Sequence, residues 1–292
     1  MNVGIVGLGL IGGCIGLELK ANGHEVYGVA RRQQTCDQAL AVQAVDKANT
    51  ELASLAPCEV VFVCTPIATI VSMVSQLAQV LSPTTVITDV ASVKGALVRA
   101  ATQQWPNFVG GHPMSGKSVA GIEAAERGLF LGNSYVITPV DGAESEDGER
   151  DGAELKTDES AIALVEQLAK ELGSVLYRCT PAEHDRAVAW ISHLPVMVSA
   201  NLIRSAVSEP DDTVRQLAEN LASSGFRDTS RVGGGTPELG LMMAQYNRAE
   251  VLRSLKRYQQ SIATTIEQLE AKDWAGIEST LEATKAARTR FV

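Results

Sequence analysis

The sequence has few of the features on which nucleic-acid and membrane proteins depend. Only 4% of its 292 residues are aromatic, and acids outnumber bases to give a formal charge of −9. A chain this acidic and this poor in stacking rings is a poor partner for a phosphate backbone. No run approaches the roughly 20 apolar residues that cross a bilayer. We therefore expect neither a nucleic-acid partner nor a membrane partner.

The cysteines are too few and too irregularly spaced for a disulfide framework or a thiolate metal site. There are five of them, and none stands in CxxC spacing. An odd count without such spacing indicates reduced thiols. The first apolar strand begins at residue 2, so no basic leader precedes it. These absences predict a cytoplasmic protein that needs no metal.

What the first half does contain is alternation of apolar strand-like and helix-like segments. A chain of 292 residues is long enough for two domains with cores of their own. Glu59–Cys64 and Thr85–Val90 are β-branched and apolar on both faces, which is typical of buried parallel strands. Helix-like stretches lie between the strands, at Ala68–Leu81 and Gly95–Gln104. Residues 1–180 are therefore predicted to form a doubly wound, mostly parallel sheet of the Rossmann type.

A glycine-rich turn directly follows the first expected strand. Asn2–Val6 leads into Gly7-Leu8-Gly9-Leu10-Ile11-Gly12, and Cys14–Leu19 continues at helical spacing. The first glycine permits a tight turn, the second lets the backbone approach a pyrophosphate, and the third lets helix pack on strand. The helix N-terminus then offers free N–H groups and a positive dipole end to phosphates. This order predicts a dinucleotide-binding site.

The second strand lacks the acid that NAD-binding chains usually place at its end. Glu25–Ala30 ends in Ala30, which cannot accept a hydrogen bond from a ribose hydroxyl through its side chain. Arg31 and Arg32 follow, and a guanidinium can bind a 2′-phosphate through paired, charge-assisted hydrogen bonds. We predict NADP rather than NAD. The alternative is that the two arginines only solvate a loop.

Two later regions differ in character from the alternating first half. Residues 141–159 are rich in Asp and Glu and have hardly any large apolar side chain, so we expect a solvated surface insertion without a site. From Pro181 the pattern is helical. Ala187–Val207 is apolar nearly all round, which favours a buried helix that Pro195 kinks or interrupts. Residues 181–292 are predicted to form a helical substrate-binding domain. Its apolar surface favours a homodimer, unless that surface is covered within one chain.

His112 is the first candidate for substrate chemistry. It follows the short expected strand Phe108–Gly110, at the edge of the sheet that faces ligands in this architecture. Imidazole titrates at about 6.5 in model peptides, so it can accept a proton at neutral pH. The flanking glycines leave room for its ring. The alternative is a histidine that is hydrogen-bonded in a tight loop.

Other polar residues end neighbouring strands. Ser92 follows Thr85–Val90, where it either caps the next helix or orients His112 or the substrate hydroxyl. Cys64, Thr65 and Pro66 end another strand and should lie beside the nicotinamide ribose.

The sequence gives weaker evidence of a functional role for the remaining histidines and for a pair of arginines. His24 is expected to be structural, and His184 to cap a helix or lie on the surface. His193 lies in the apolar helix beside Pro195, where it either contacts substrate or satisfies carbonyls that the proline frees. Arg227 and Arg231 stand in a glycine-bounded stretch. If that stretch is helical, Asp228 can pair with Arg231 and orient it toward a carboxylate; the alternative is a surface ion pair.

These segments together resemble the prephenate/arogenate dehydrogenase family over nearly the whole chain. GLGLIGG, TDVASVKG, GGHPMSG, ISHLP and GFRDTSR stand in the family's order. The double arginine makes the chain most similar to the NADP-dependent arogenate dehydrogenases. The resemblance implies oxidative decarboxylation of L-arogenate to tyrosine, carbon dioxide and NADPH, with no metal. It also implies that His112 is catalytic with Ser92 beside it, that His193 contacts substrate, and that Arg231 binds the ring carboxylate. We group Arg227 with these substrate-binding residues.

One position departs from the family pattern, and three other functions stay open. The family often has a carboxylate where this chain has Ser118, which puts any ion network at that position in doubt.

Prephenate is the nearest rival substrate. A β-hydroxyacid dehydrogenase would need a catalytic lysine in the helical half, where only Lys256, Lys272 and Lys285 occur, none in an apolar or glycine-rich setting. A non-catalytic NADPH sensor is the alternative of another class.

Overall fold

The computed structural model describes residues 1–117, 119–140 and 156–291. The chain forms two compact units: Met1–Val188 with Gly235–Asn247, and Ala189–Gly234 with Arg248–Val292. The division expected from the sequence fell at residue 180. The first unit extends further because helix α6 (Pro181–Val188) and helix α10 (Pro237–Tyr246) belong with it.

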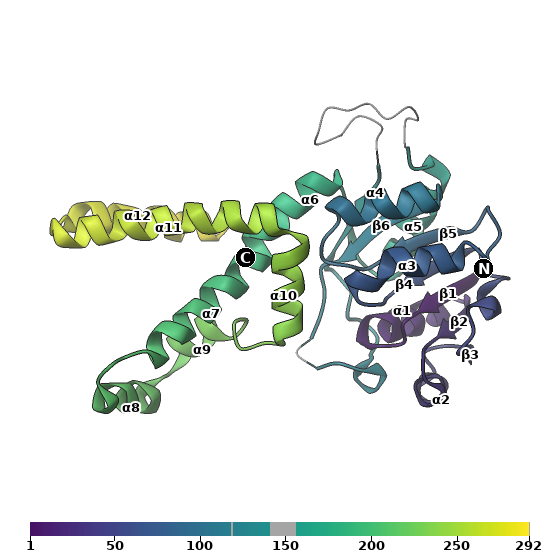
Figure 1. Ribbon diagram of the computed structural model, residues 1–292, viewed down its shortest axis with the longest axis horizontal. Coiled ribbons are helices and arrows are strands. Elements are labelled where there is room, and N and C mark those ends of the chain that lie inside the picture. Colours follow the sequence, from purple (N-terminus) through teal and green to yellow (C-terminus); the bar gives the residue numbers. More distant parts are fainter. Residues whose placement is uncertain (118, 141–155, 292) are drawn as a thin grey trace. The chain divides into compact units, whose positions relative to one another are not determined.

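The first unit is built on one eight-stranded sheet (Figure 1) in the order β3-β2-β1-β4-β5-β6-β7-β8. Neighbouring strands are parallel except β6 and β7. Strand order reverses between β1 and β4, the place where doubly wound sheets bind ligands at the carboxyl ends of their strands. The strands are β1 (Asn2–Val6), β2 (Glu25–Val29), β3 (Lys47–Asn49), β4 (Val60–Val63), β5 (Val86–Asp89), β6 (Phe108–Pro113), β7 (Ser134–Thr138) and β8 (Val175–Arg178).

Each face of the sheet has its own apolar core. Val60 and Phe62 of β4 join the core that α1 (Leu10–Ala21), α2 (Gln33–Ala41) and α5 (Glu159–Glu171) cover. The alternate residues of β4, Val61 and Val63, join the core beneath α3 (Ile67–Leu77) and α4 (Gly95–Gln104). Successive strand residues point to opposite faces, so a strand that is apolar throughout must be covered on both sides. The predicted doubly wound sheet is confirmed.

Some local boundaries differ from the sequence-based expectation; for example, the helix expected at Ala68–Leu81 is α3, Ile67–Leu77. The short edge strand β3 was not predicted, because its three residues carry no apolar pattern. Strand β6 is longer than expected and runs to Pro113, so His112 lies within the strand rather than after it. Most of the acidic segment expected to be a surface insertion, residues 141–155, lies outside the described residues.

The second unit is helical. The 5-residue π-helical turn Ala189–His193 comes directly before α7 (Leu194–Val207), so the expected interruption lies just before Pro195. The expected burial of this helix is wrong for the single chain: within α7 only Leu194 and Ser199 are buried, and Val207 is 58% exposed. The unit continues through α8 (Asp212–Leu221), α9 (Ser224–Ser230), α11 (Arg248–Glu270) and α12 (Trp274–Arg288).

Helices α11 and α12 pack along each other (Figure 1). Neither α8 nor α12 contains a buried residue. No helix in the described part of the chain is long and apolar enough to cross a membrane.

Candidate active site

The glycine-rich turn directly follows β1, beside the end of β4, and its shape fits a dinucleotide diphosphate. Gly7 has a φ of +100°, and a Cβ there would lie 2.6 Å from the carbonyl oxygen of Cys64. A Cβ on Gly12 would lie 2.2 Å from the carbonyl oxygen of Gly7, whereas a Cβ on Gly9 would have no atom within 4 Å. The first and third glycines are thus needed for close packing, and the second faces open space. Leu8 is buried, and Leu10 and Ile11 pack against the first core.

Helix α1 begins at Leu10, within this glycine-rich stretch. Gly9 is the N-cap residue and provides no side-chain cap, and the first turn contains no acid. The first N–H groups of a helix have no partner within it, and with the helix dipole they favour an anion. The residues present therefore fit the diphosphate of a nicotinamide dinucleotide.

The ends of β2 and β4 flank the glycine-rich turn. Ala30 is buried and donates its N–H to Asn49, while Arg31 and Arg32 are exposed. The N–H of Cys64 donates to the carbonyl of Val6 over 2.7 Å, which ties the β4 end to β1. Burial raises the pKa of the Cys64 thiol, so it stays neutral.

Thr65 and Pro66 follow Cys64 and lead into α3. The Thr69 hydroxyl donates to the Thr65 hydroxyl and also contacts the Pro66 carbonyl, while Pro66 occupies the N-cap position of α3. Cofactor-binding roles for the residues around this turn stay predictions.

His112 is buried near the carboxyl end of β6, and two glycines before it let β6 pack tightly. A Cβ on Gly110 would lie 2.3 Å from the Thr138 hydroxyl, and one on Gly111 would lie 2.7 Å from the Tyr135 hydroxyl and 2.8 Å from the Asp89 carbonyl. The expectation that these glycines leave room for the imidazole ring is therefore wrong. Their space is taken by neighbouring strands β5 and β7.

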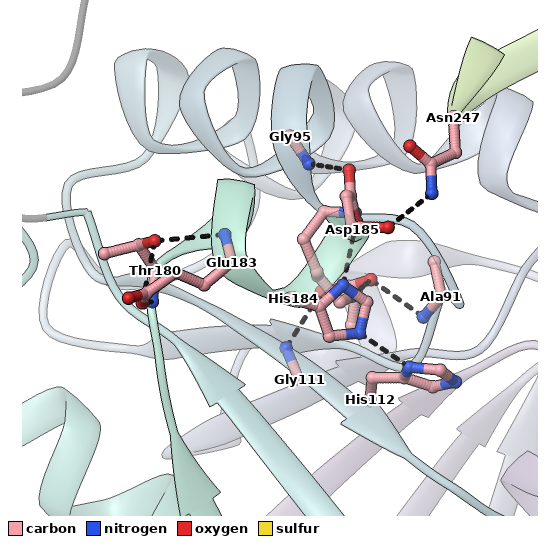
Figure 2. Close-up of polar contacts among 11 residues, drawn as sticks. Ala91, Gly95, Gly111, His112, Thr180, Glu183, His184, Asp185 and Asn247 are labelled. Atoms are coloured by element: carbon pink, nitrogen blue, oxygen red, sulfur yellow. Dashed lines mark hydrogen bonds and ion pairs between the residues drawn. The ribbon is translucent and has the colours of Figure 1, made fainter. Parts of the chain in front are cut away.

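A chain of hydrogen bonds leads from His112 to helix α6 (Figure 2). His112 Nδ1 lies 2.8 Å from His184 Nε2, and His184 Nδ1 lies 2.8 Å from Asp185 Oδ1. Both α6 side chains are buried. The expectation that His184 caps a helix or lies on the surface is therefore wrong.

The cap of α6 is made by residues on either side of its first turn. The Thr180 N–H donates to Glu183 Oε2 over 2.9 Å, and the Glu183 N–H donates to the Thr180 hydroxyl over 3.2 Å. This is a capping box, and Pro181 begins the helix between its two members. It leaves His184 on the face of α6 that turns toward β6.

Asp185 also holds the start of α4. Its carboxylate accepts the N–H groups of Lys94 and Gly95, each over 2.7 Å. Its own carbonyl accepts from the Asn247 side chain over 2.7 Å. Asp185 thus joins α6 to the start of α4 through its carboxylate, and to the residue after α10 through its backbone carbonyl (Figure 2).

The loop that carries Ser92 is held by a second buried carboxylate. Asp89, at the end of β5, forms an ion pair with Lys94 and accepts the N–H groups of Ala91 and Gly111. Both members of the pair are fully buried. Burial lowers the pKa of Lys94, and the Asp89 carboxylate opposes that shift. The N-cap position of α4 falls on Lys94, so the expected capping role of Ser92 is wrong.

When both histidines are neutral, the hydrogen-bond partners along the row from Asp185 to His112 allow their protons to be assigned. Ionised Asp185 can only accept, so His184 donates from Nδ1 and, when neutral, accepts at Nε2. His112 then donates from Nδ1 and carries its lone pair on Nε2. A histidine in this form can accept a proton at Nε2, which is what a general base requires.

The other predicted substrate residues lie in the second unit. His193 is fully buried at the end of the π-helical turn. Arg227 pairs with the adjacent Asp228 over 3.1 Å on the exposed side of α9, so the expected pairing of Asp228 with Arg231 is wrong. Arg231 is exposed directly after α9. Ser118 lies outside the described residues.

The sequence-based interpretation missed four residues of this site: Asp89, Lys94, His184 and Asp185. A signal was present in the Thr180-Pro181-Ala182-Glu183 capping box, which places the following two residues in a helical turn. Within residues 1–117, 119–140 and 156–291, no group of His, Cys, Asp and Glu could hold a metal ion.

Comparison with known proteins gives matches over nearly the whole chain. The nucleotide-binding domain of prephenate dehydrogenase matches residues 15–150, and its dimerization domain matches residues 180–283. Prephenate dehydrogenase of Bacillus subtilis is 29% identical over 92% of this chain and 71% of its own length.

Two solved structures are similar over the whole fold. Synechocystis arogenate dehydrogenase is 45% identical with a TM-score of 0.87, and the alignment covers 100% of both chains. Prephenate dehydrogenase from Aquifex aeolicus, in complex with hydroxyphenyl propionate and NAD+, has a TM-score of 0.88 at 24% identity, covering 100% of this chain and 98% of its own. At that identity it supports the fold alone.

The doubly wound sheet, the glycine-rich turn and the matching nucleotide-binding domain define a nucleotide-binding dehydrogenase. With both domain models matched in order and a 45% identical relative of the same extent, the chain belongs to the prephenate/arogenate dehydrogenase family.

Proposed function

We propose that this protein is an NADP-dependent arogenate dehydrogenase that converts L-arogenate to L-tyrosine and carbon dioxide. The observation that carries the cofactor choice is the end of β2, where Ala30 replaces an acid and two exposed arginines follow. Each guanidinium there can pair with a 2′-phosphate, and no side-chain carboxylate stands at the end of β2 to repel it. The preference for arogenate is supported by similarity to the Synechocystis arogenate dehydrogenase over both full chains.

NADP would be held by the turn Gly7-Leu8-Gly9-Leu10-Ile11-Gly12 with Cys64, Thr65 and Pro66 beside it, and by Arg31 and Arg32 at its 2′-phosphate. The bound nicotinamide supplies the acceptor for the hydride that leaves the ring carbon bearing the hydroxyl. His112 accepts the hydroxyl proton at Nε2 as carbonyl character develops at that carbon. The ring carboxylate leaves as carbon dioxide, and the electrons of the broken bond complete the aromatic ring. The hydrogen bond to His112 strengthens mainly in the transition state, where it lowers the barrier.

Ser92 lies on the loop between β5 and α4, and we assign it to orienting His112 or the substrate hydroxyl and to the cofactor side of the site. In the second unit, His193 and Arg227 are assigned to substrate contact, and Arg231 to the ring carboxylate. A guanidinium on that carboxylate orients the ring, but stabilising its charge opposes loss of carbon dioxide. We therefore assign Arg231 to binding and geometry rather than to rate.

We also propose that the protein acts as a homodimer through the second unit. The matching model over residues 180–283 is a dimerization domain. The unit has large apolar side chains exposed on its long helices, including Ile262, Ile266 and Leu269 on α11. Such a surface is typical of a subunit interface.

Prephenate is the second candidate substrate, favoured by the similarity to curated prephenate dehydrogenases, with B. subtilis prephenate dehydrogenase at 29% identity. The deciding experiment measures NADPH and NADH formation with arogenate and prephenate side by side. We expect the highest kcat/KM with arogenate and NADP. A higher kcat/KM with prephenate would reject the substrate assignment, and a preference for NAD would reject the cofactor assignment.

The cofactor assignment has a direct variant test. Replacing Arg31 and Arg32 by Ser and Gln should reduce the NADP/NAD ratio of kcat/KM by about 10- to 100-fold, the effect of one hydrogen bond to a charged group. The ratio is measured from initial rates with each cofactor. An unchanged ratio would assign these arginines to loop solvation.

A further inference from the structure

The hydrogen-bond chain behind His112 has a consequence for how that histidine works. His184 contacts His112 on the side opposite its Nε2 (Figure 2). His184 is in turn held by Asp185, whose carboxylate is fixed by the N–H groups of Lys94 and Gly95. His112, His184 and Asp185 are all buried, so water does not compete for the hydrogen bonds between them.

We propose that His184 and Asp185 are positioning residues that hold His112 in its Nδ1–H form and take up the charge when His112 accepts a proton. This inference rests on the proposed role of His112 as the proton acceptor. The substrate proton moves to His112 Nε2. The Nδ1 proton of His112 then moves to His184 Nε2, and the positive charge comes to rest on His184 beside the ionised Asp185. Protons and charge balance, and no other reactant is needed.

The surroundings of His184 decide which groups affect this transfer. Asp185 lies on the same helix, His112 faces it from β6, and Lys94 is joined to Asp185 through its backbone. Asp89 neutralises the ammonium of Lys94. Cys179 is affected by the charge of Asp185, and burial raises the pKa of its thiol, so it stays neutral. Asp185 is the charged side chain that is hydrogen-bonded to His184.

A first measurement needs neither substrate nor cofactor. Histidine side-chain ¹H–¹⁵N correlation spectra distinguish the Nδ1–H form of imidazole from the Nε2–H form. The chain has only four histidines, so single His→Gln variants assign every signal. We expect His112 to be the Nδ1–H form in the wild-type protein and to lose that preference in His184→Phe, which keeps a ring but provides no acceptor. A His112 signal of the Nε2–H form in the wild-type protein would overturn the proposal.

The kinetic measurement compares two substitutions at the same position. His184→Phe should lower kcat by about 10²- to 10³-fold, within the usual range for general-base assistance. Its KM should change less than threefold, because His184 is assigned no contact with substrate. His184→Gln provides a carbonyl acceptor for His112 but cannot take up a proton. Its kcat should be about tenfold higher than that of His184→Phe, which is the lower end of the effect of a hydrogen bond to a charged group.

His24→Gln is the matched control. His24 also pairs with a carboxylate, that of Glu171, and no role in the site is assigned to it. It should leave kcat and the His112 spectrum unchanged. Wild-type kcat in His184→Phe, or equal losses in Phe and Gln variants that both fold, would overturn the relay. If the wild-type protein oxidises neither arogenate nor prephenate, the proposed function fails, while the spectrum still tests the hydrogen-bond chain.

Discussion

The two units of this protein break the usual pattern of burial in opposite ways. The sheet unit buries charged and polar side chains beneath its ligand-binding edge, among them Asp89, Lys94, His184 and Asp185. The helical unit leaves large apolar side chains in water: Leu221 on α8 is 69% exposed and Leu281 on α12 is 63% exposed. Burying charge is costly unless it is paired, and exposing apolar surface is costly unless it is covered. We therefore relate each exception to a proposed function: the buried polar residues to the proposed reaction centre, and the exposed apolar residues to the proposed association surface.

The largest expected effect comes from removing the proposed base, His112. His112→Asn should lower kcat by about 10²- to 10⁴-fold, the usual contribution of general-base assistance. Because Asn keeps a polar side chain and the glycine-rich turn is untouched, NADP should bind as before. Initial rates give kcat, and fluorescence titration gives the NADP dissociation constant. Near-normal turnover would remove His112 from the mechanism.

The second effect concerns the buried ion pair beneath the Ser92 loop. Lys94→Met leaves the Asp89 carboxylate buried with two N–H donors but no counter-charge, so the free energy of unfolding should fall by about 3–5 kcal/mol. Urea denaturation measures the loss. Adding Asp89→Asn to this variant should restore part of it, since the unpaired charge is then gone.

The matched control for this pair lies in the helical unit. Arg215 pairs with Asp212 over 2.6 Å on α8, where the Asp212 side chain is 76% exposed. Arg215→Met should cost less than about 1 kcal/mol, as is usual for an exposed pair. Equal losses for Lys94→Met and Arg215→Met would contradict the contrast between the two units.

The third effect tests the association surface. Ile266 lies on α11 and is half exposed. Ile266→Glu should weaken the dimer by about 1–1.5 kcal/mol, because association can bury only the exposed half of a side chain whose full burial contributes about 1.5–3 kcal/mol. Sedimentation velocity at a series of concentrations measures the dissociation constant. Leu131→Glu in the sheet unit is the control: its side chain is 73% exposed, and we expect no change. Equal dissociation in both variants, or a wild-type monomer, would contradict the proposed interface.

The comparison also separates what sequence can predict from what it cannot. The apolar pattern identified the buried strands: Val60–Val63 is apolar at every position, and a strand with that pattern must be covered on both faces. The glycine-rich turn was equally predictable from the sequence. Its backbone φ and close contacts require glycine, so the glycines themselves mark the turn. The sequence patterns that predict these features lie in residues adjacent in the chain.

The polar network depends on residues far apart in the chain. Asp185 accepts hydrogen bonds from Lys94 and Gly95, which precede it by about 90 positions. Its neighbour His184 was interpreted as a surface residue, because a histidine at the start of a helix usually faces water. Nothing local to Pro181–Val188 shows that β6 and α4 cover this face. For the same reason, helical periodicity identified the apolar Ala187–Val207 segment but not that one chain leaves much of it uncovered.

The smallest effect links helix capping to the polar network. Thr180 and Glu183 cap α6, which carries His184 and Asp185, so Thr180→Ala should lower the free energy of unfolding by about 1 kcal/mol. Hydrogen bonds from the N–H and hydroxyl of Thr180 lower the pKa of Glu183 below its ordinary 4.5. A carboxyl group with a lowered pKa in the folded state stabilises the fold above that ordinary value, and the stabilisation is lost as the pH falls through the lowered pKa.

The pH dependence makes this last prediction specific to the cap. The melting temperatures of the wild-type protein and of Glu183→Gln should therefore differ at neutral pH and become equal as the pH falls below 4.5. If the buried partners of α6 hold it in place, Thr180→Ala and Glu183→Gln should both keep the hydrogen bonds from α6 to β6 and α4. Under conditions where each variant is fully folded, its kcat should then stay within about twofold of the wild-type value. A large loss of kcat in Thr180→Ala would instead show that the network depends on the local cap. That outcome would contradict the contrast drawn here, in which long-range buried pairing, not local helix structure, keeps the polar interior of the sheet unit in place.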